Sequence, residues 1–414
     1  MKNRALLPLF WLMLFDTASY TIRFPVLTLV FYDHQSSLFT TTASVATRSW
    51  WYGICMALYW LGSIIAAPIL STWSDYAGRK KTLIFGSIGT FIFASCTALG
   101  VIWGMLSLLL LGSLIGGLCT RLDPIAQAAV GDIGSAEQKM RNMSYLQLFL
   151  AIGAFFGPII GGYFAYGYSF KQLNFSLPFF IAAVLALCGL FIMLNYFRET
   201  LDLSIKPPQS KYASFKAVVT NKQVLYISTI LILMQISWST YYQFIGPIIK
   251  KDFNFSGVEL GFFMGMIAFW LALASAIVMP YLSRFLSAMQ IIRYSTYAVF
   301  VGLIGTAFLL VFPHIQWLHY LIWFFAIPIA AGDVMSYCAI TTLYSNAVAK
   351  TAQGQVMGAN FIIVSIVWMS TAFMGGVLMG HHAALPLLLA LLGIGALTIL
   401  QQFNRHTACL IITR

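Results

Sequence analysis

Charged side chains are scarce in this sequence. Lys, Arg, Asp and Glu together make up only 8% of the 414 residues, whereas a soluble domain usually carries about a quarter. Hydrophobic residues make up 60%, and apolar runs of roughly 20 residues, long enough to cross a bilayer, recur along the chain. The composition excludes an ordinary soluble protein. It predicts an all-α membrane protein with many spans, because the alternation over about ten residues that marks a membrane barrel is missing.

Residue clusters that hold metals or carry out covalent chemistry are also lacking. The six cysteines are scattered and no two have metal-ligand spacing, so we interpret them as small packing residues. His381 and His382 are adjacent, and adjacent side chains diverge on a helix. We find no nucleophile–base pair, no phosphate-binding loop and no soluble domain. The sequence therefore gives no indication of an enzyme, an ATP-driven pump or a sensor, and we expect no metal and no cofactor.

Twelve transmembrane helices are predicted from the apolar runs. The longest polar interruption follows the sixth of them. It divides the chain into an N-terminal six-helix bundle (1–197), a cytoplasmic linker (198–220) and a C-terminal six-helix bundle (221–414). The predicted spans are 5–31, 49–73, 81–101, 104–130, 143–166, 174–197, 221–248, 257–283, 290–312, 316–345, 354–379 and 382–403.

The cations lie mainly on one side of these spans. With the N-terminus in the cytoplasm, seventeen Lys and Arg residues fall on the cytoplasmic side, and only Arg48, Lys171, Lys250 and Lys251 fall outside. This asymmetry satisfies the positive-inside rule. It predicts a multi-pass protein of the plasma (inner) membrane with both termini in the cytoplasm. The net charge of +12 then reflects topology, so we expect a lipid bilayer and no nucleic acid as partner, and a monomer.

The loop after the second predicted span combines an acid, a glycine and several cations. The segment "PILSTWSDYAGRKK" carries Asp75, Gly78, Arg79 and Lys80 and resembles the loop between helices two and three of the major facilitator superfamily, although two of its positions depart from the family pattern. Gly78 permits a tight turn, and Asp75 can accept charge-assisted hydrogen bonds from helix N-termini or cations. We therefore expect these four residues to form a conformational latch on the cytoplasmic face. A plain basic loop is the alternative.

A second segment resembles the helix-five motif of drug/proton antiporters. In "GAFFGPIIGG" the matching residues are Gly153, Gly157, Pro158, Gly161 and Gly162. Small residues at every fourth position let helices approach closely, and a proline kinks the span. In the family this motif is associated with exporters. Close helix packing without a transport role is the alternative.

Two further fragments resemble the twelve-helix tetracycline-efflux branch. These are "DTASYTIRFP" (16–25) in the first span and "FRETL" (197–201) after the sixth. One departure concerns the fourth span, where "LLLGSLIGG" (109–117) lacks the arginine that antiporters usually carry. The resemblance therefore does not extend to the family's standard proton relay.

The two halves contain similar segments. "DTASYTIRFP" in the first span and "WSTYYQFIGP" (238–247) in the seventh both end on a proline and place Tyr20 and Tyr242 in register. Gly161 and Gly162 match Gly375 and Gly376 at an offset of 214 residues. Two pseudo-symmetric bundles around a central site are the usual architecture of transporters with parallel repeats. Chance similarity among glycine-rich helices is the alternative.

Four ionisable residues are predicted near the middle of the bilayer. From the helical rise, Asp16, Arg121, Asp123 and Asp333 lie roughly 13 to 17 Å from the ends of their spans, and charges at this depth are usually functional. Arg121 and Asp123 are two residues apart and point to different sides of a helix, so we expect Arg121 to pair with Asp16 or Asp333. Arg23 lies closer to the outer interface, where it can either snorkel or bind substrate.

These charges predict coupling between protons and substrate. A buried carboxyl can take up and release a proton, so Asp16 and Asp123 are the candidate proton carriers. Arg121 is the candidate switch or substrate anchor. A static network of salt bridges is the alternative.

Aromatic and amide side chains lie at similar depths. Gln235, Trp238 and Tyr242 share one face of the seventh span, and Tyr59 lies in the second. Such a surface suits a mid-sized amphiphilic organic molecule. The predicted substrate-binding set is Arg23, Tyr59, Arg121, Gln235, Trp238, Tyr242 and Asp333.

Taken with the resemblance, these residues imply a secondary active transporter of the antiporter type. We expect proton-coupled efflux of a small organic compound, either a drug or a metabolite such as a siderophore, by alternating access. A proton-coupled importer of a nutrient or another small organic solute is the alternative, because the fourth span departs from the antiporter pattern.

Overall fold

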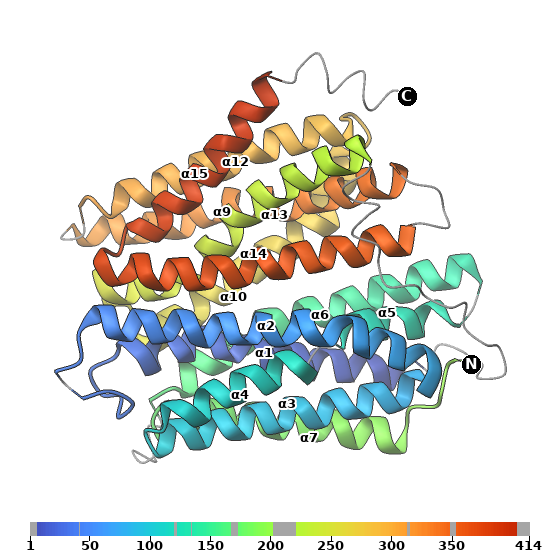
Figure 1. The fold of residues 1–414 in the computed structure, drawn as a ribbon, viewed down its shortest axis with the longest axis horizontal. Helices are drawn as coiled ribbons and strands as arrows, with labels where there is room; N and C mark the ends of the chain where they lie inside the picture. Colours follow the sequence, from blue (N-terminus) through green and yellow to red (C-terminus); the bar gives the residue numbers. More distant parts are fainter. Residues whose placement is uncertain are drawn as a thin grey trace. The chain divides into compact units, whose positions relative to one another are not determined.

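The structure of the chain is a computed structural model that describes residues 6–40, 42–119, 122–133, 135–166, 173–201, 221–312, 315–347 and 353–403. Within these ranges the regular elements are helices and no strand occurs (Figure 1). The helices are α1 (Leu7–Tyr32), α2 (Val45–Ala77), α3 (Arg79–Ile102), α4 (Leu106–Cys119), α5 (Asp123–Gly131), α6 (Ala136–Phe164), α7 (Leu177–Asn195), α9 (Lys222–Asp252), α10 (Gly257–Leu273), η3 (Ala274–Val278), α11 (Met279–Leu282), α12 (Ala288–Leu309), η4 (Gln316–Tyr320), α13 (Leu321–Asn346), α14 (Gln353–His381) and α15 (Leu385–Phe403).

The predicted all-α membrane fold is confirmed. Eleven helical segments in the described part of the chain are long and apolar enough to cross a membrane. The remaining predicted span corresponds to α1, which has 26 residues and is more polar because it carries Asp16, Arg23 and several hydroxyl side chains. Predicted and observed helix ends differ by seven residues at the start of α6 and by fewer elsewhere, because each span coincides with one long apolar run.

The fourth predicted span is described as two helical pieces, α4 and α5. We expected one continuous helix over 104–130. The structure describes α4 up to Cys119 and α5 from Asp123, with residues 120 and 121 between them outside the described residues, and 106–131 together are long and apolar enough for one membrane span. The continuity of this helix therefore stays a prediction. Pro124 accounts for the start of α5 at Asp123, since proline is suited to the first turn of a helix and not to its interior. The placement of Arg121 and Asp123 on one continuous helix likewise stays a prediction. Arg121 lies outside the described residues.

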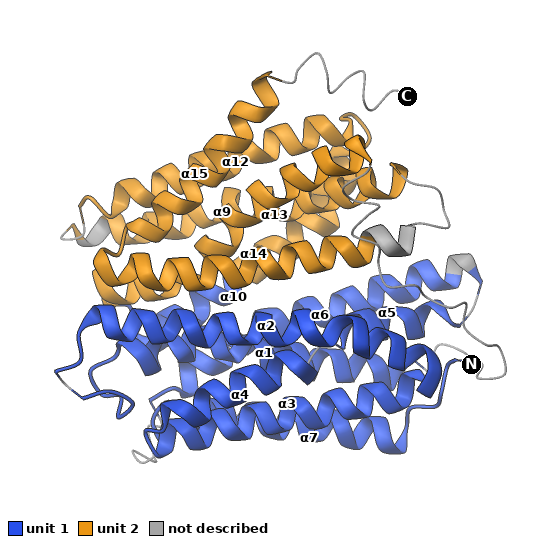
Figure 2. Cartoon of the chain, in the orientation of Figure 1, with its two compact units in different colours: residues 1–210, 255–266 blue, residues 211–254, 267–414 orange. Residues whose placement is uncertain are grey.

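The chain divides into two compact units (Figure 2). The first contains Met1–Ser210 together with Phe255–Met266, and the second contains Lys211–Asn254 together with Ile267–Arg414. The division after Ser210 falls within the predicted linker, most of which lies outside the described residues. The predicted C-terminal bundle included 255–266, which the structure groups with the first unit, because the first half of α10 packs against α6 there.

In the first unit, α1 is surrounded by other helices. It contacts α6 and α7 most extensively and also touches α2, α3 and α5. From Thr21 to Phe31 every residue of α1 is buried. The helix that carries Asp16 and Arg23 is therefore the central element of this unit.

In the second unit, α9 has a comparable place. It contacts α13, α14 and α15, and from Ser237 to Ile249 every residue is buried. A similar hydrogen bond occurs in both units. Ser19 of α1 donates to the Ala182 carbonyl of α7 at 3.0 Å, and Ser237 of α9 donates to the Ala390 carbonyl of α15 at 2.8 Å. This correspondence between the first and last helices of each unit agrees with the repeat predicted from the sequence.

Candidate functional site

Asp16 lies inside α1 and faces α3. Only 6% of the residue is exposed, and its Oδ1 accepts a hydrogen bond of 2.8 Å from the Thr90 hydroxyl. Both ion pairs found among the described residues involve Arg79, so the described partner of Asp16 is neutral. A carboxyl held in this way has no fixed counter-charge in the described part of the chain.

Asp123 lies in the first turn of α5 and is partly exposed. A carboxylate is favourable there because the N-terminus of a helix carries partial positive charge. Its charge also acts on Asp16, so α1 and α5 bring the two predicted proton carriers into one neighbourhood. The expected pairing of Arg121 with Asp16 or Asp333 remains a prediction, because Arg121 is not described.

Arg23 lies seven residues after Asp16, close to two full helical turns, and therefore on the same face of α1. It is 0% exposed, so the alternative that it snorkels to the outer interface is wrong. Its guanidinium carbon lies 4.2 Å from the Tyr59 ring centroid, and the rings of Tyr20 and Phe24 follow at 5.2 and 5.4 Å. The structure thus brings together two residues of the predicted substrate-binding set, Arg23 and Tyr59.

Most hydrogen-bond donors of Arg23 have no acceptor among the described residues. Its Nη2 atom donates to Sδ of Met56 at 3.0 Å, and a thioether is a weak acceptor. Its Nε and Nη1 atoms are buried and have no hydrogen-bond partner among the described residues. The guanidinium therefore rests on aromatic faces and a sulfur atom.

A hydrogen-bonded chain connects three helices of the second unit. The Trp368 indole of α14 donates to Oε1 of Gln235 in α9 at 2.9 Å, and Nε2 of Gln235 donates to Oδ1 of Asp333 in α13 at 3.3 Å. All three residues are buried. Gln235 and Asp333, both predicted for the substrate site, are therefore direct neighbours.

Aromatic rings continue this cluster along α9. Trp238 and Tyr242 stack with centroids 5.3 Å apart, and Tyr242 meets Trp368 edge-on at 6.1 Å. Next to Trp238 in sequence, Ser239 shares a hydrogen bond of 2.8 Å with Thr371 of α14. The predicted face of α9 is thus a buried surface of aromatic and amide groups.

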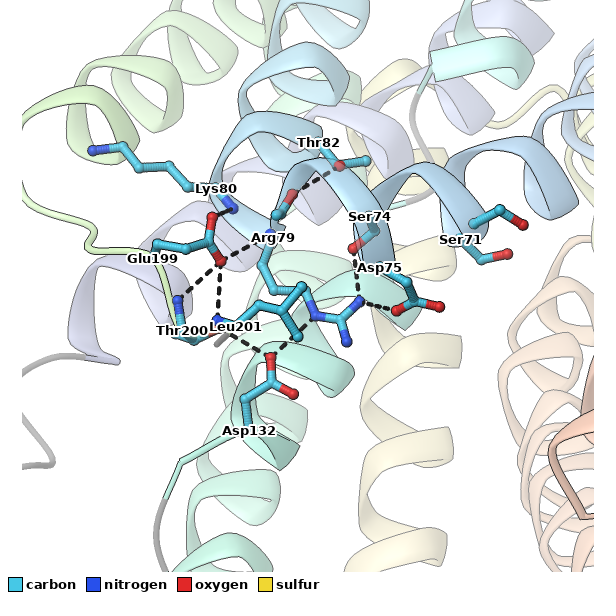
Figure 3. Close-up of polar contacts among 12 residues, drawn as sticks. Ser71, Ser74, Asp75, Arg79, Lys80, Thr82, Asp132, Glu199, Thr200 and Leu201 are labelled. Carbon is cyan, nitrogen blue, oxygen red and sulfur yellow. Dashed lines mark hydrogen bonds and ion pairs between the residues drawn. The ribbon is translucent and has the colours of Figure 1, made fainter. Parts of the chain in front are cut away.

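The predicted latch residues form a polar network at one end of the first unit (Figure 3). Nη1 of Arg79 donates to Oδ1 of Asp75 at 2.6 Å and to the Ser74 hydroxyl at 2.8 Å. Its Nε donates to Oδ2 of Asp132, just after α5, at 3.1 Å. One guanidinium therefore ties α2 to α5, as its fork of donors allows.

Glu199 completes the network from the segment after α7 (Figure 3). Its carboxylate accepts from the backbone N–H groups of Arg79 at 2.9 Å and Lys80 at 3.1 Å, where the N-terminus of α3 favours an anion. Lys80 Nζ donates to the Leu194 carbonyl at the end of α7. All of these contacts lie within the first unit, so a latch that changes with conformation remains a proposal.

Gly78 is required at this turn. It has a φ of 103°, a region that side chains rarely adopt. A Cβ atom there would also contact the Glu199 carboxylate. The glycine in the loop motif thus lets the acid sit directly on the start of α3.

The glycines of the predicted antiporter motif lie where α6 approaches two other helices. A Cβ on Gly153, Gly157 or Gly161 would meet backbone atoms of α1, and one on Gly162 would meet Gly257 and Gly261 of α10. Pro158 lies within α6, and its carbonyl faces Gly261. Close approach of helices through small residues, as expected, is what these positions provide.

Several contributing residues were not predicted. Thr90, Asp132, Glu199, Met56 and Trp368 all contact predicted site residues. Glu199 lies in the "FRETL" fragment, which had a sequence signal but no assigned role. Asp132 lies just after the fourth predicted span. Thr90, Met56 and Trp368 look like ordinary span residues, because nothing in their local sequence indicates which neighbour they meet.

In the described part of the chain, no group of three His, Cys, Asp or Glu side chains is positioned to hold a metal ion. The candidate residues of the first unit are two acids, Asp16 and Asp123, and the ring-enclosed Arg23, and those of the second unit are Asp333, Gln235 and the aromatic rings beside them.

The fold is that of a membrane protein with many helical spans. The Major Facilitator Superfamily model matches residues 9–372, and the chain belongs to this family. It is 25% identical over 331 residues to the class E tetracycline resistance protein of Escherichia coli, covering 77% of this chain and 75% of that protein. It is also 25% identical over 351 residues to the quinolone resistance protein NorA of Staphylococcus aureus (strain COL), covering 82% and 83%. The predicted resemblance to drug/proton antiporters is confirmed.

A solved structure supports the fold. The D-xylose-proton symporter superposes with a TM-score of 0.71 at 14% identity, covering 95% of this chain and 96% of that one. At this identity the likeness establishes the shared fold alone.

Proposed function

We propose that this protein is a secondary active transporter that exports a small organic compound in exchange for protons. The observation that carries the proposal is Asp16, buried in α1 and held by the neutral hydroxyl of Thr90. Because no ion pair locks its charge in the described part of the chain, Asp16 can take up and release a proton during the transport cycle. Asp123 acts on the same carboxyl and is the second candidate carrier.

The substrate surface in this proposal is aromatic and amide in character. Trp238, Tyr242 and Trp368 provide ring faces, and Gln235 and Asp333 provide hydrogen-bonding groups beside them. Such surroundings suit a mid-sized amphiphilic organic molecule.

Export rather than import is favoured by two considerations. The relatives named for resistance to tetracycline and quinolones support an outward direction. The glycine motif of α6 resembles that of exporters and makes the close helix contacts expected of it. The endogenous substrate is then either a drug-like compound or a metabolite such as a siderophore.

The test is transport in inverted membrane vesicles that express the full chain. An exporter accumulates a fluorescent amphiphilic drug inside such vesicles when their lumen is acidified, and a protonophore abolishes the accumulation. Asp16→Asn is expected to abolish it as well, whereas Glu259→Gln, an exposed acid that caps α10 through Ser256, leaves it unchanged. Accumulation only in right-side-out vesicles would establish the importer instead, and indifference to protonophore would reject proton coupling.

A further inference from the structure

We propose that Arg23 binds a carboxylate on the transported molecule, so that the substrate is an organic anion with an aromatic or other flat apolar part. The cluster consists of Arg23, Tyr20, Phe24, Met56 and Tyr59, all in the first unit. This inference rests on the proposed transport function only in naming the occupant as substrate.

The first step of the argument is the missing counter-charge. Arg23 is 0% exposed, and no acid forms an ion pair with it in the described ranges of the chain. A buried charge is costly unless it is paired and hydrogen-bonded. A guanidinium in these surroundings is explained most simply by an anion that arrives during function.

The second step concerns the donors. A guanidinium carries five N–H donors in a planar fork. The described hydrogen bond of Arg23 runs from its Nη2 atom to the Met56 sulfur. Its Nε and Nη1 atoms have no hydrogen-bond partner among the described residues. A carboxylate matches the geometry of such a fork and forms short charge-assisted bonds with it.

The third step concerns the walls of the cluster. Tyr59, Tyr20 and Phe24 place ring faces around the guanidinium at 4.2 to 5.4 Å. Rings attract the cation through cation–π interactions without neutralising it, so Arg23 keeps its charge for a ligand. Tyr59 and Tyr20 also lie 5.1 Å apart and offer aromatic surface to an apolar part of the same molecule.

The fourth step concerns approach. Phe24, Met56 and Tyr59 are buried, whereas Tyr20 is only partly buried, so a ligand reaches the guanidinium past Tyr20. Asp16 lies on the same face of α1 at a rise of about 10 Å from Arg23. That separation is too large for an ion pair, and it leaves the proton site and the anion site as distinct points on one helix.

The experiment compares matched probes on the purified full-length protein. Thermal unfolding in neutral detergent is measured with a panel of aromatic carboxylates and their neutral amides, beginning with 2-naphthoate and 2-naphthamide. We expect the carboxylates to raise the unfolding midpoint more than their amides. In Arg23→Met the apparent affinity for 2-naphthoate falls about 10- to 100-fold, the loss expected for a hydrogen bond to a charged group, and Arg23→Lys restores part of it.

Arg48→Met is the matched control. Arg48 is on α2 and donates to backbone carbonyls of Phe31, Thr40 and Ala43, outside the cluster, so this variant keeps the preference for carboxylates. If Arg23→Met does not fold, the comparison of carboxylate with amide on the native protein and on Arg23→Lys still decides the matter.

Two results would overturn the proposal. Equal midpoints for every carboxylate and its amide on the native protein would exclude an anion site. Displacement of 2-naphthoate by phosphatidylglycerol, with no displacement by phosphatidylcholine, would make an anionic lipid the occupant and reject the substrate assignment. The unfolding measurements need no proton gradient, so they test the Arg23 site independently of transport. If the protein prefers carboxylates but the vesicles show no proton-driven transport, the proposed proton coupling is rejected and the Arg23 site is retained.

Discussion

Arg79 and Asp132 are 53 residues apart in sequence, yet Nε of the arginine donates to Oδ2 of the aspartate over 3.1 Å. The same arginine forms a shorter contact of 2.6 Å with Asp75, four residues before it. The Asp132 side chain is 19% exposed and the Asp75 side chain 41%. Burial and distance therefore rank the two pairs in opposite orders.

We predict that burial decides. An exposed pair four residues apart contributes about 0.3–0.5 kcal/mol, and a better-shielded charged hydrogen bond contributes about 1.5–3 kcal/mol. Double-mutant cycles of Arg79→Gln with Asp132→Asn and with Asp75→Asn, measured by chemical unfolding, are expected to give the larger coupling energy for Asp132. A larger value for Asp75 would show that the shorter, more exposed contact dominates.

The bond between Thr90 and Asp16 leads to a second prediction. Thr90→Val keeps the shape of the side chain and removes the donor, so proton-driven transport should fall about 10- to 100-fold, as for loss of one hydrogen bond to a charged group. Thr97→Val is the control, because Thr97 is equally buried on α3 and bonds only to the Phe93 carbonyl in the described structure. Equal transport rates for the two variants in vesicles would separate Thr90 from the proton step.

The chain from Trp368 through Gln235 to Asp333 predicts an order of stabilities. Gln235→Leu removes both bonds and should cost the most, and Trp368→Phe removes one and should cost about 1–2 kcal/mol, since each leaves a buried polar group unsatisfied. Trp270→Phe is the control for the change of ring, because the described contact of Trp270 is with the neighbouring Phe269 ring. Thermal unfolding midpoints test the order, and a Trp270 variant as destabilised as Trp368→Phe would contradict it.

The contact between α6 and α10 predicts opposite effects of one added methyl group. A Cβ on Gly261 would lie 2.5 Å from the Pro158 carbonyl oxygen, so Gly261→Ala should destabilise the protein by about 1–3 kcal/mol. Gly395 of α15 has nothing within 4 Å of a Cβ, and Gly395→Ala should stabilise it by up to about 1 kcal/mol. Chemical unfolding of both variants checks the signs. Stabilisation by Gly261→Ala would mean that the two helices separate at no cost.

Much of the fold follows from local sequence. The apolar runs locate the spans, because a bilayer requires about 20 apolar residues whatever lies beside them. The "SDYAGRKK" loop could also be assigned from its own residues, since the turn at Gly78 and the contact between Asp75 and Arg79 are local. The start of α5 at Asp123 was also foreseeable from Pro124 alone, because proline is suited to the first turn of a helix.

The site could be predicted only in part. Asp16, Asp333 and Gln235 were found because polar groups inside spans are rare. Their partners Thr90 and Trp368 were not, because many threonines and tryptophans occur in spans and only packing selects one of them.

The sequence by itself determined that this chain is a membrane protein of helices, where the spans lie, and to which family it belongs, because hydrophobic length and short motifs act locally. Only the tertiary structure decided that Arg79 reaches Asp132, that Glu199 sits on the start of α3, and that Arg23 is enclosed by rings. These relations depend on which helices pack together and on how their faces are turned. Those choices are made by contacts between residues far apart in the chain, which no local pattern records.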